Sequence, residues 1–234
     1  METSAFLELA RLVVTGDIDT VSRRLCSTPA FATMALPIRT AVREPTDPFF
    51  TEISHYMYGA DTLLHMAAAA FSRPMAELLV SHGADCRAKN RRGAQPLHYA
   101  SDGYRSEPRA QVDTIEFLIS MGAEVNAIDK SGVAPLHRAV RKRSIEAVRA
   151  LLDGGAQLLQ PNKSGSTPLH LAVQNTGASG SGSDEARQRQ AAIIKLLLAR
   201  GASPTDKDAR GKTVEQAATS EWIRELLSDT KASK

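Results

Sequence analysis

The sequence predicts an all-α solenoid of stacked helix-turn-helix repeats joined by β-hairpin-like turns. Two short motifs recur in phase along the chain. A Leu-His pair occurs four times, with its histidines at positions 65, 98, 137 and 170, spaced by 33, 39 and 33 residues. A Gly-Ala pair follows each of them, with its glycines at positions 83, 122, 155 and 201. A period near 33 residues with a fixed phase is typical of a solenoid, in which each repeat packs only on its neighbours.

The second and fourth repeats contain extra residues between the two motifs. The gap from histidine to glycine is 18 residues in the first and third repeats, but 24 in the second and 31 in the fourth. The extra residues fall in 101–111 and in the Gly/Ser-rich stretch within 174–188. We expect both to form loops on one side of the solenoid, and loops on a rigid scaffold often carry function. The sequence leaves open whether these two do so.

Each repeat carries the signals of two short helices followed by a turn. Thr167 is a candidate N-cap, and Pro168 suits the first helical turn, where its missing N–H costs nothing. The second helix shows apolar spacing, as at Ile145, Val148 and Leu151. The glycine of the Gly-Ala pair then ends this helix, because glycine readily adopts the left-handed C′ conformation. About ten residues rich in Asn, Asp, Ser and Gly follow, which indicates a turn or hairpin.

These motifs resemble the ankyrin repeat. The resemblance rests on Thr-Pro-Leu-His-Leu-Ala at 167–172, Pro-Leu-His-x-Ala at 135–139 and Gly-Ala-Glu-Val-Asn-Ala at 122–127, and it covers about residues 59–227. The segment 61–65 lacks the proline, and 212–218 has lost Pro-Leu-His, as a C-terminal capping repeat would. The resemblance implies stacked ankyrin repeats and a protein-binding function.

The repeat register divides the chain into six segments. They are a degenerate N-terminal capping repeat plus insertion (1–58), a repeat (59–93), a repeat with a helix–helix insertion (94–132), a repeat (133–165), a repeat with a Gly/Ser-rich insertion (166–211), and a C-terminal capping repeat with a tail (212–234). In the first segment, we expect the insertion to be packed down by Phe49, Phe50, Ile53, Tyr56 and Tyr58.

Composition and charge predict an ordinary soluble protein. The 234 residues are 42% hydrophobic and 24% charged, with a net charge of +3, which alone is too small to indicate nucleic-acid binding. Two isolated cysteines, Cys26 and Cys86, predict reduced thiols rather than a disulfide framework. The sequence has neither a signal-peptide pattern nor a run of about 18 apolar residues. We therefore expect a cytoplasmic monomer that does not associate with membranes.

No catalytic or cofactor-binding motif stands out. Four of the six histidines belong to the repeat motif, and helices stacked roughly 8–10 Å apart cannot bring one histidine per repeat to a single zinc ion. The resemblance implies instead that these histidines bond to backbone near the hairpins. Gly211-Lys212-Thr213 resembles the end of a phosphate-binding loop, but position 206 is Asp rather than Gly. We expect a protein without enzymatic activity, metal or cofactor.

The resemblance implies binding through the hairpin tips and the exposed face of each first helix, and these positions are mostly basic. Basic strips favour acidic partners and speed encounter. Asp129 and Asp208 are expected to brace the hairpins instead. The candidate partner-binding residues are Lys89, Arg91, Arg92, Asp102, Tyr104, Lys130, Arg141, Lys142, Lys163, Gln174, Asn175, Arg210 and Lys212.

Three functions are compatible with this pattern. The repeat array and the absence of a catalytic constellation favour a protein–protein interaction module that binds a protein partner in the concave groove. A nucleic-acid-binding protein that uses the basic strip is the second reading, although few aromatic residues could stack on bases. An enzyme with its site in residues 29–58 or in the long loops is the third.

Overall fold

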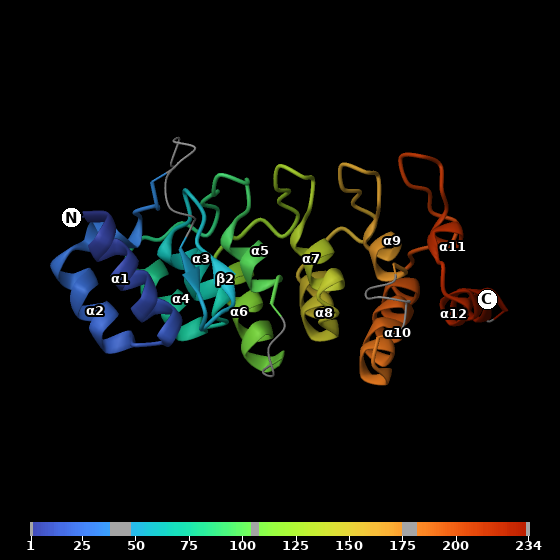
Figure 1. Ribbon diagram of the computed structural model, residues 1–234, viewed down its shortest axis with the longest axis horizontal. Helices are drawn as coiled ribbons and strands as arrows, with labels where there is room; N and C mark the ends of the chain where they lie inside the picture. The colour runs from blue at the N-terminus through green and yellow to red at the C-terminus, as the bar shows by residue number, and fades with distance from the viewer. Residues whose placement is uncertain (1, 38–47, 104–107, 175–181, 233–234) are drawn as a thin grey trace.

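The protein is an elongated array of paired helices with its termini at opposite ends (Figure 1). The computed structural model describes residues 2–37, 48–103, 108–174 and 182–232. Within these ranges the helix pairs are α1 (Glu2–Thr15) with α2 (Ile18–Ser27), α3 (Leu63–Ala69) with α4 (Arg73–Ser81), α5 (Pro96–Ala100) with α6 (Pro108–Ser120), α7 (Pro135–Arg141) with α8 (Ile145–Asp153), α9 (Pro168–Ala172) with α10 (Asp184–Ala199), and α11 (Val214–Ala217) with α12 (Glu221–Ala232). The predicted all-α solenoid is confirmed.

The helix ends follow the predicted signals. The helix α9 begins at Pro168 with Thr167 as its N-cap residue. Ser144 caps α8, its hydroxyl accepting a hydrogen bond from the N–H of Ala147. The glycine of the Gly-Ala pair has a positive φ after every second helix, for example 94° at Gly155. The predicted left-handed C′ glycine is therefore confirmed.

The core is a continuous ladder built from equivalent positions of successive repeats. The leucine of each Leu-His pair is buried, and so is the residue four before each Gly-Ala glycine. Because every repeat contributes the same two side chains, each interface between repeats buries similar apolar surface. These ladder residues are Leu64, Leu97, Leu136 and Leu169 on the first helices, and Leu79, Leu118, Leu151 and Leu197 on the second helices.

Four hairpins, which we call the repeat hairpins, lie side by side along one edge of the array (Figure 1). Each is closed by a backbone bond of 3.0 Å, and a side-chain oxygen of its first residue accepts two further backbone N–H groups. The predicted bracing role of Asp129 and Asp208 is thereby confirmed. The repeat hairpins span residues 90–94, 129–133, 162–166 and 208–212.

Backbone bonds also join each repeat hairpin to the next. The N–H of Lys130 donates to the carbonyl of Arg92 at 2.8 Å, and the N–H of Lys163 donates to the carbonyl of Ser131 at 3.3 Å. This close approach leaves no room for a side chain at Gly132, where a Cβ atom would lie 2.7 Å from the nitrogen of Lys163. Gly132 also has a φ of 71°, so both sterics and conformation require glycine there.

The N-terminal insertion contains a second kind of hairpin. The short 3₁₀ helix η1 (Pro29–Ala32) precedes it, and the strands β1 (Phe49–Phe50) and β2 (His55–Tyr56) pair antiparallel. We call residues 48–57 the insertion hairpin. Phe50 is buried, but Phe49 and Tyr56 are 45% and 44% exposed. The prediction that all the aromatic residues pack the insertion down is therefore wrong for Phe49 and Tyr56, because side chains alternate between the two faces of a strand.

Two buried glutamines occupy equivalent places in the two repeats that carry insertions. Gln111 and Gln190 each lie 11 residues before the Gly-Ala glycine, where the other two repeats have the N-cap serines Ser72 and Ser144. The insertions extend α6 and α10 past this position, so it becomes helix interior. Gln111 Nε2 donates to the carbonyl of Ala100 at 2.8 Å, and its Oε1 accepts from the hydroxyl of Ser144 at 2.7 Å.

Gln190 forms the same kind of link one insertion later. Its Nε2 donates to the carbonyls of Ala172 and Gln174 at 2.7 and 3.1 Å, and its Oε1 accepts from Arg143 at 2.9 Å. Each glutamine thus donates to a carbonyl at the end of the first helix of its own repeat. Its side-chain oxygen accepts a hydrogen bond from the third repeat, which follows Gln111 and precedes Gln190. The insertions are anchored by a polar side chain that replaces a helix cap.

Replacing Gln111 with alanine should lower the free energy of unfolding by about 1–3 kcal/mol, because buried polar groups lose their partners. Urea unfolding followed by circular dichroism measures the change. Gln157→Ala, at an exposed position, is the matched control and should be neutral. Equal unfolding midpoints for Gln111→Ala and the control would contradict the anchoring role.

Candidate functional site

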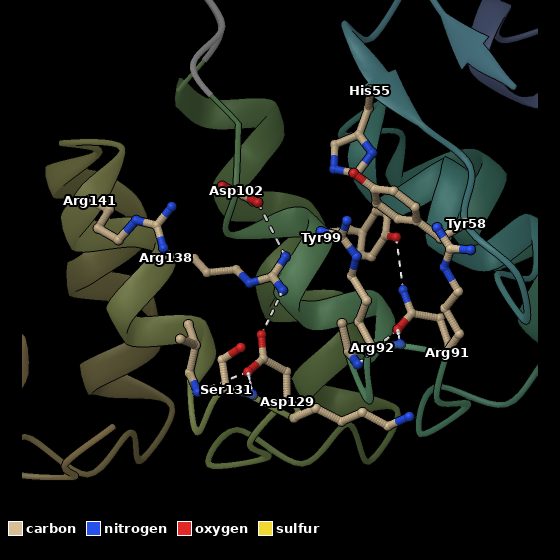
Figure 2. A pocket seen from close by; sticks show the side chains of 14 residues that line it. His55, Tyr58, Arg91, Arg92, Tyr99, Asp102, Asp129, Ser131, Arg138 and Arg141 are labelled. Carbon is tan, nitrogen blue, oxygen red and sulfur yellow. Dashed lines mark hydrogen bonds and ion pairs between the residues drawn. The ribbon is translucent and has the colours of Figure 1, made fainter. Parts of the chain in front are cut away.

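An open pocket of about 420 Å³ lies between the first two repeat hairpins and the first helices α5 and α7 (Figure 2). His55 and Tyr58, from the insertion hairpin and the residues after it, form its N-terminal wall. The lining residues are His55, Tyr58, Asn90, Arg91, Arg92, Ala94, Tyr99, Asp102, Asp129, Lys130, Ser131, Val133, Arg138 and Arg141.

Arg138 lies at the centre of the pocket and binds two carboxylates. Its Nη1 atom lies 3.2 Å from Asp102, and its Nη2 atom lies 3.0 Å from Asp129 (Figure 2). The side chain is only 13% exposed, so its geometry is fixed by both ion pairs. Sequence reasoning missed Arg138. The available signal was its position, because the residue after the motif histidine is apolar or aromatic in the other repeats, namely Met66, Tyr99 and Leu171.

Asp129 joins the pocket to the second repeat hairpin. Its Oδ1 atom accepts the N–H groups of Ser131 and Val133, while its Oδ2 atom binds Arg138. Burial raises the pKa of Asp129, but the Val133 N–H and the Arg138 guanidinium outweigh it and hold the pKa below its usual value. Asp129 is therefore ionised at neutral pH, and it ties the position of Arg138 to that of the hairpin.

A buried polar cluster supports the N-terminal end of the pocket. Asp61 accepts hydrogen bonds from the Tyr99 hydroxyl at 2.8 Å, from Asn90 Nδ2 at 2.9 Å and from the N–H of Tyr58 at 2.6 Å. Burial and the Asp61 carboxylate raise the pKa of Tyr99, so its hydroxyl keeps its proton and remains the donor to Asp61. This cluster links three parts of the chain and fixes the tyrosine ring in the pocket wall.

Two guanidinium groups lie against the ring of Tyr58. The Cζ atom of Arg92 is 3.9 Å from the ring centroid and that of Arg91 is 5.4 Å from it. Contact with an aromatic face orients a guanidinium group while leaving its N–H edges available. The Arg92 side chain is exposed, as are Lys130 and Arg141 on the opposite side of the pocket.

The structure brings five of the predicted site residues together in the pocket, namely Arg91, Arg92, Asp102, Lys130 and Arg141. Lys142 is adjacent, with its Nζ atom 3.5 Å from Asp102. Gln174 lines a smaller pocket of about 160 Å³ that shares Arg141 with the first.

The remaining candidates lie elsewhere. Lys89 precedes the first repeat hairpin, Lys163 is in the third, and Arg210 and Lys212 are in the fourth; all are exposed and none lines the pocket. Tyr104 and Asn175 lie outside the described residues.

The motif histidines bind backbone, as the family resemblance implies. The N–H of Gln95 donates to His98 Nδ1 at 3.1 Å, so the ring proton is on Nε2, which donates to the carbonyl of Val133 at 3.0 Å. His65 and His170 repeat this arrangement with the carbonyls of Ala94 and Lys212. His137 keeps the first bond, to the N–H of Ala134, while its Nε2 has no partner among the described residues.

Burial lowers the pKa of His65, His98 and His137, and that of His98 falls to about 3. These imidazoles are therefore neutral at physiological pH. In the described part of the chain, no three His, Cys, Asp or Glu side chains are grouped so that they could bind a metal ion. None of the described helices has both the length and the apolar character needed to cross a membrane.

The stacked helix pairs, the repeat hairpins and the histidine bonds define a repeat protein of the helical solenoid class. The family description "Ankyrin repeats (3 copies)" matches residues 40–129 and 108–208, and the chain belongs to the ankyrin-repeat family. The family is typically non-catalytic, and its repeats generally mediate protein–protein interactions. A comparison with curated proteins gave no match.

Because these histidines are neutral in the folded protein, the free energy of unfolding should decrease between pH 7 and pH 5. In this window the unfolded chain binds protons at histidines with a pKa near 6.5, while folded His98 binds none until about pH 3. Stability therefore falls as pH falls, by about 2 kcal/mol from His98 alone at pH 5. Urea unfolding at the two pH values measures this loss. Equal free energies would contradict the neutral buried state, and His98→Ala should reduce the pH dependence.

Proposed function

We propose that the protein is a non-catalytic, cytoplasmic interaction module that binds an acidic segment of a protein partner in the pocket at its concave face. Ankyrin repeats generally mediate protein–protein interactions, which supports this class of function. The pocket lies between the first two repeat hairpins and the helices α5 and α7, and it is open to solvent. An extended peptide segment of the partner is the natural ligand for a groove of this form.

The distribution of charge in the pocket carries the proposal. Both carboxylates that line it, Asp102 and Asp129, bind Arg138. In the described part of the chain, Arg92, Lys130 and Arg141 form no ion pair, and their exposed side chains line the pocket. Acidic side chains of a partner would complement these three cations, and such complementarity chiefly sets specificity and association rate.

The arginine–carboxylate ion pairs make this a prearranged site. Because Arg138 is held by two partners, an incoming acid does not need to order it. Arg92 is likewise oriented by the ring of Tyr58 before a ligand arrives. Less side-chain entropy is then lost on binding, which increases the affinity that each ion pair can supply.

Reversing the charge of Arg92 and Arg141 together should weaken partner binding at least tenfold. The change places two carboxylates at the pocket opening, where they repel an acidic ligand. The experiment is affinity capture from lysate with and without nuclease, followed by calorimetric titration of each captured protein with the purified variants. We expect a protein captured by the wild type, insensitive to nuclease, whose affinity falls at least tenfold in Arg92→Glu/Arg141→Glu.

The matched control is Arg149→Glu/Lys195→Glu, which changes the net charge equally on the exposed faces of α8 and α10. It should bind as the wild type does. Unchanged affinity in the pocket variant would refute the proposal, and loss of all capture on nuclease treatment would favour nucleic-acid binding instead.

A further inference from the structure

Two aromatic side chains of the insertion hairpin face solvent. Phe49 and Tyr56 are cross-strand partners, and their ring centroids lie 4.8 Å apart. They are 45% and 44% exposed, and are among the most exposed large apolar residues of the described chain. Neighbouring exposed aromatic residues are enriched at binding surfaces and costly to leave in water.

These rings continue into the basic pocket. The Tyr56 ring centroid is 6.2 Å from that of Tyr58, and Tyr58 in turn contacts the guanidinium group of Arg92 at 3.9 Å. We call Phe49, Tyr56 and Tyr58 the aromatic row. It leads from solvent directly to the pocket wall, so the apolar surface and the cationic site form one continuous surface.

The insertion hairpin is held firmly in this position. Phe50 and Met57 are buried, and the N–H of Met57 donates to the carbonyl of Pro48 at 2.8 Å. On the inner side, the ring of His55 lies 4.6 Å from that of Tyr99 in the pocket wall. The buried residues fix the hairpin on the array, so the outward-facing rings are presented on a rigid support.

We propose that the aromatic row makes the site bipartite. The partner segment would carry an acidic side chain that binds Arg92, Lys130 and Arg141, and a large apolar or aromatic side chain that packs on Phe49 and Tyr56. This inference rests on the proposed function and names the chemistry of the partner. Charge complementarity with the pocket cations orients the segment, and the rings supply the desolvated anchor that charged contacts alone lack.

The geometry sets the spacing of the two recognition elements. The steps from Tyr56 to Tyr58 and from Tyr58 to Arg92 measure 6.2 and 3.9 Å. An extended peptide advances about 3.3 Å per residue. These two steps together give only the largest possible separation, and alternate side chains of an extended peptide face the same side. The acidic and apolar side chains of the partner should therefore lie two residues apart.

A displayed library of random dodecapeptides tests this without knowledge of the natural partner. The wild type should enrich peptides with an acidic residue and an aromatic or large apolar residue two positions apart. Phe49→Ser/Tyr56→Ser changes only exposed side chains and should still enrich acidic peptides, without the apolar preference. Leu159→Ser, at a residue that is 50% exposed and outside the pocket lining, is the control and should enrich as the wild type does.

Fluorescence anisotropy with an enriched peptide then measures how much its apolar residue contributes to the affinity. Replacing its apolar residue by serine should weaken binding to the wild type roughly tenfold, as expected for one aromatic contact, and leave binding to the Phe49→Ser/Tyr56→Ser variant unchanged. Equal enrichment of purely acidic peptides by both proteins would overturn the bipartite site and leave the proposed function intact.

Two other outcomes have distinct meanings. If the wild type enriches no acidic peptides, or if Arg92→Glu/Arg141→Glu enriches the same ones, the proposed function fails together with this inference. If sedimentation shows that the wild type self-associates and that Phe49→Ser/Tyr56→Ser prevents it, the aromatic row binds a second copy of the chain, and the bipartite site is refuted.

Discussion

The stacking of the repeats depends on the motif histidine, which links a first helix to the next repeat hairpin in three of the four repeats. One ring nitrogen of His98 accepts the N–H of Gln95 in its own repeat, and the other donates to Val133 in the following repeat hairpin. A single side chain thus fixes the start of a first helix against the neighbouring hairpin. Because Nδ1 can accept the Gln95 N–H only when the ring is neutral, the burial that lowers the pKa of His98 preserves this bond.

The histidine bonds do not involve the side chain of the next residue, so that position is free to vary, and it contributes side chains to the pocket. The residue after the motif histidine is Tyr99 in the second repeat and Arg138 in the third. Tyr99 donates to Asp61 and fixes the wall, while Arg138 joins Asp102 to Asp129. The fold supplies the positions, and the chemistry of the groove comes from which side chain occupies each of them.

The fold was predictable because its signals are local and repeated. The Leu-His and Gly-Ala motifs, the hairpin acids Asp129 and Asp208 and the C′ glycines each act within a few residues. The site was only partly predictable, because its contacts join residues far apart in sequence. Arg138 and Asp102 are 36 positions apart, and Tyr99 and Asp61 are 38 apart. No local pattern reports such pairs, so sequence reasoning found the cations but not what orders them.

Under the proposed function, recognition is concentrated at the pocket rather than spread evenly along the groove. Every repeat hairpin presents basic residues, including Lys163 and Arg210 far from the pocket. What distinguishes the second and third repeats is the insertion hairpin, which supplies His55 and the nearby Tyr58 as an N-terminal wall. An ion pair between exposed side chains contributes little binding free energy unless the surrounding structure holds the charges in a favourable geometry. The insertion before the regular array is thus what converts part of a basic strip into a shaped site.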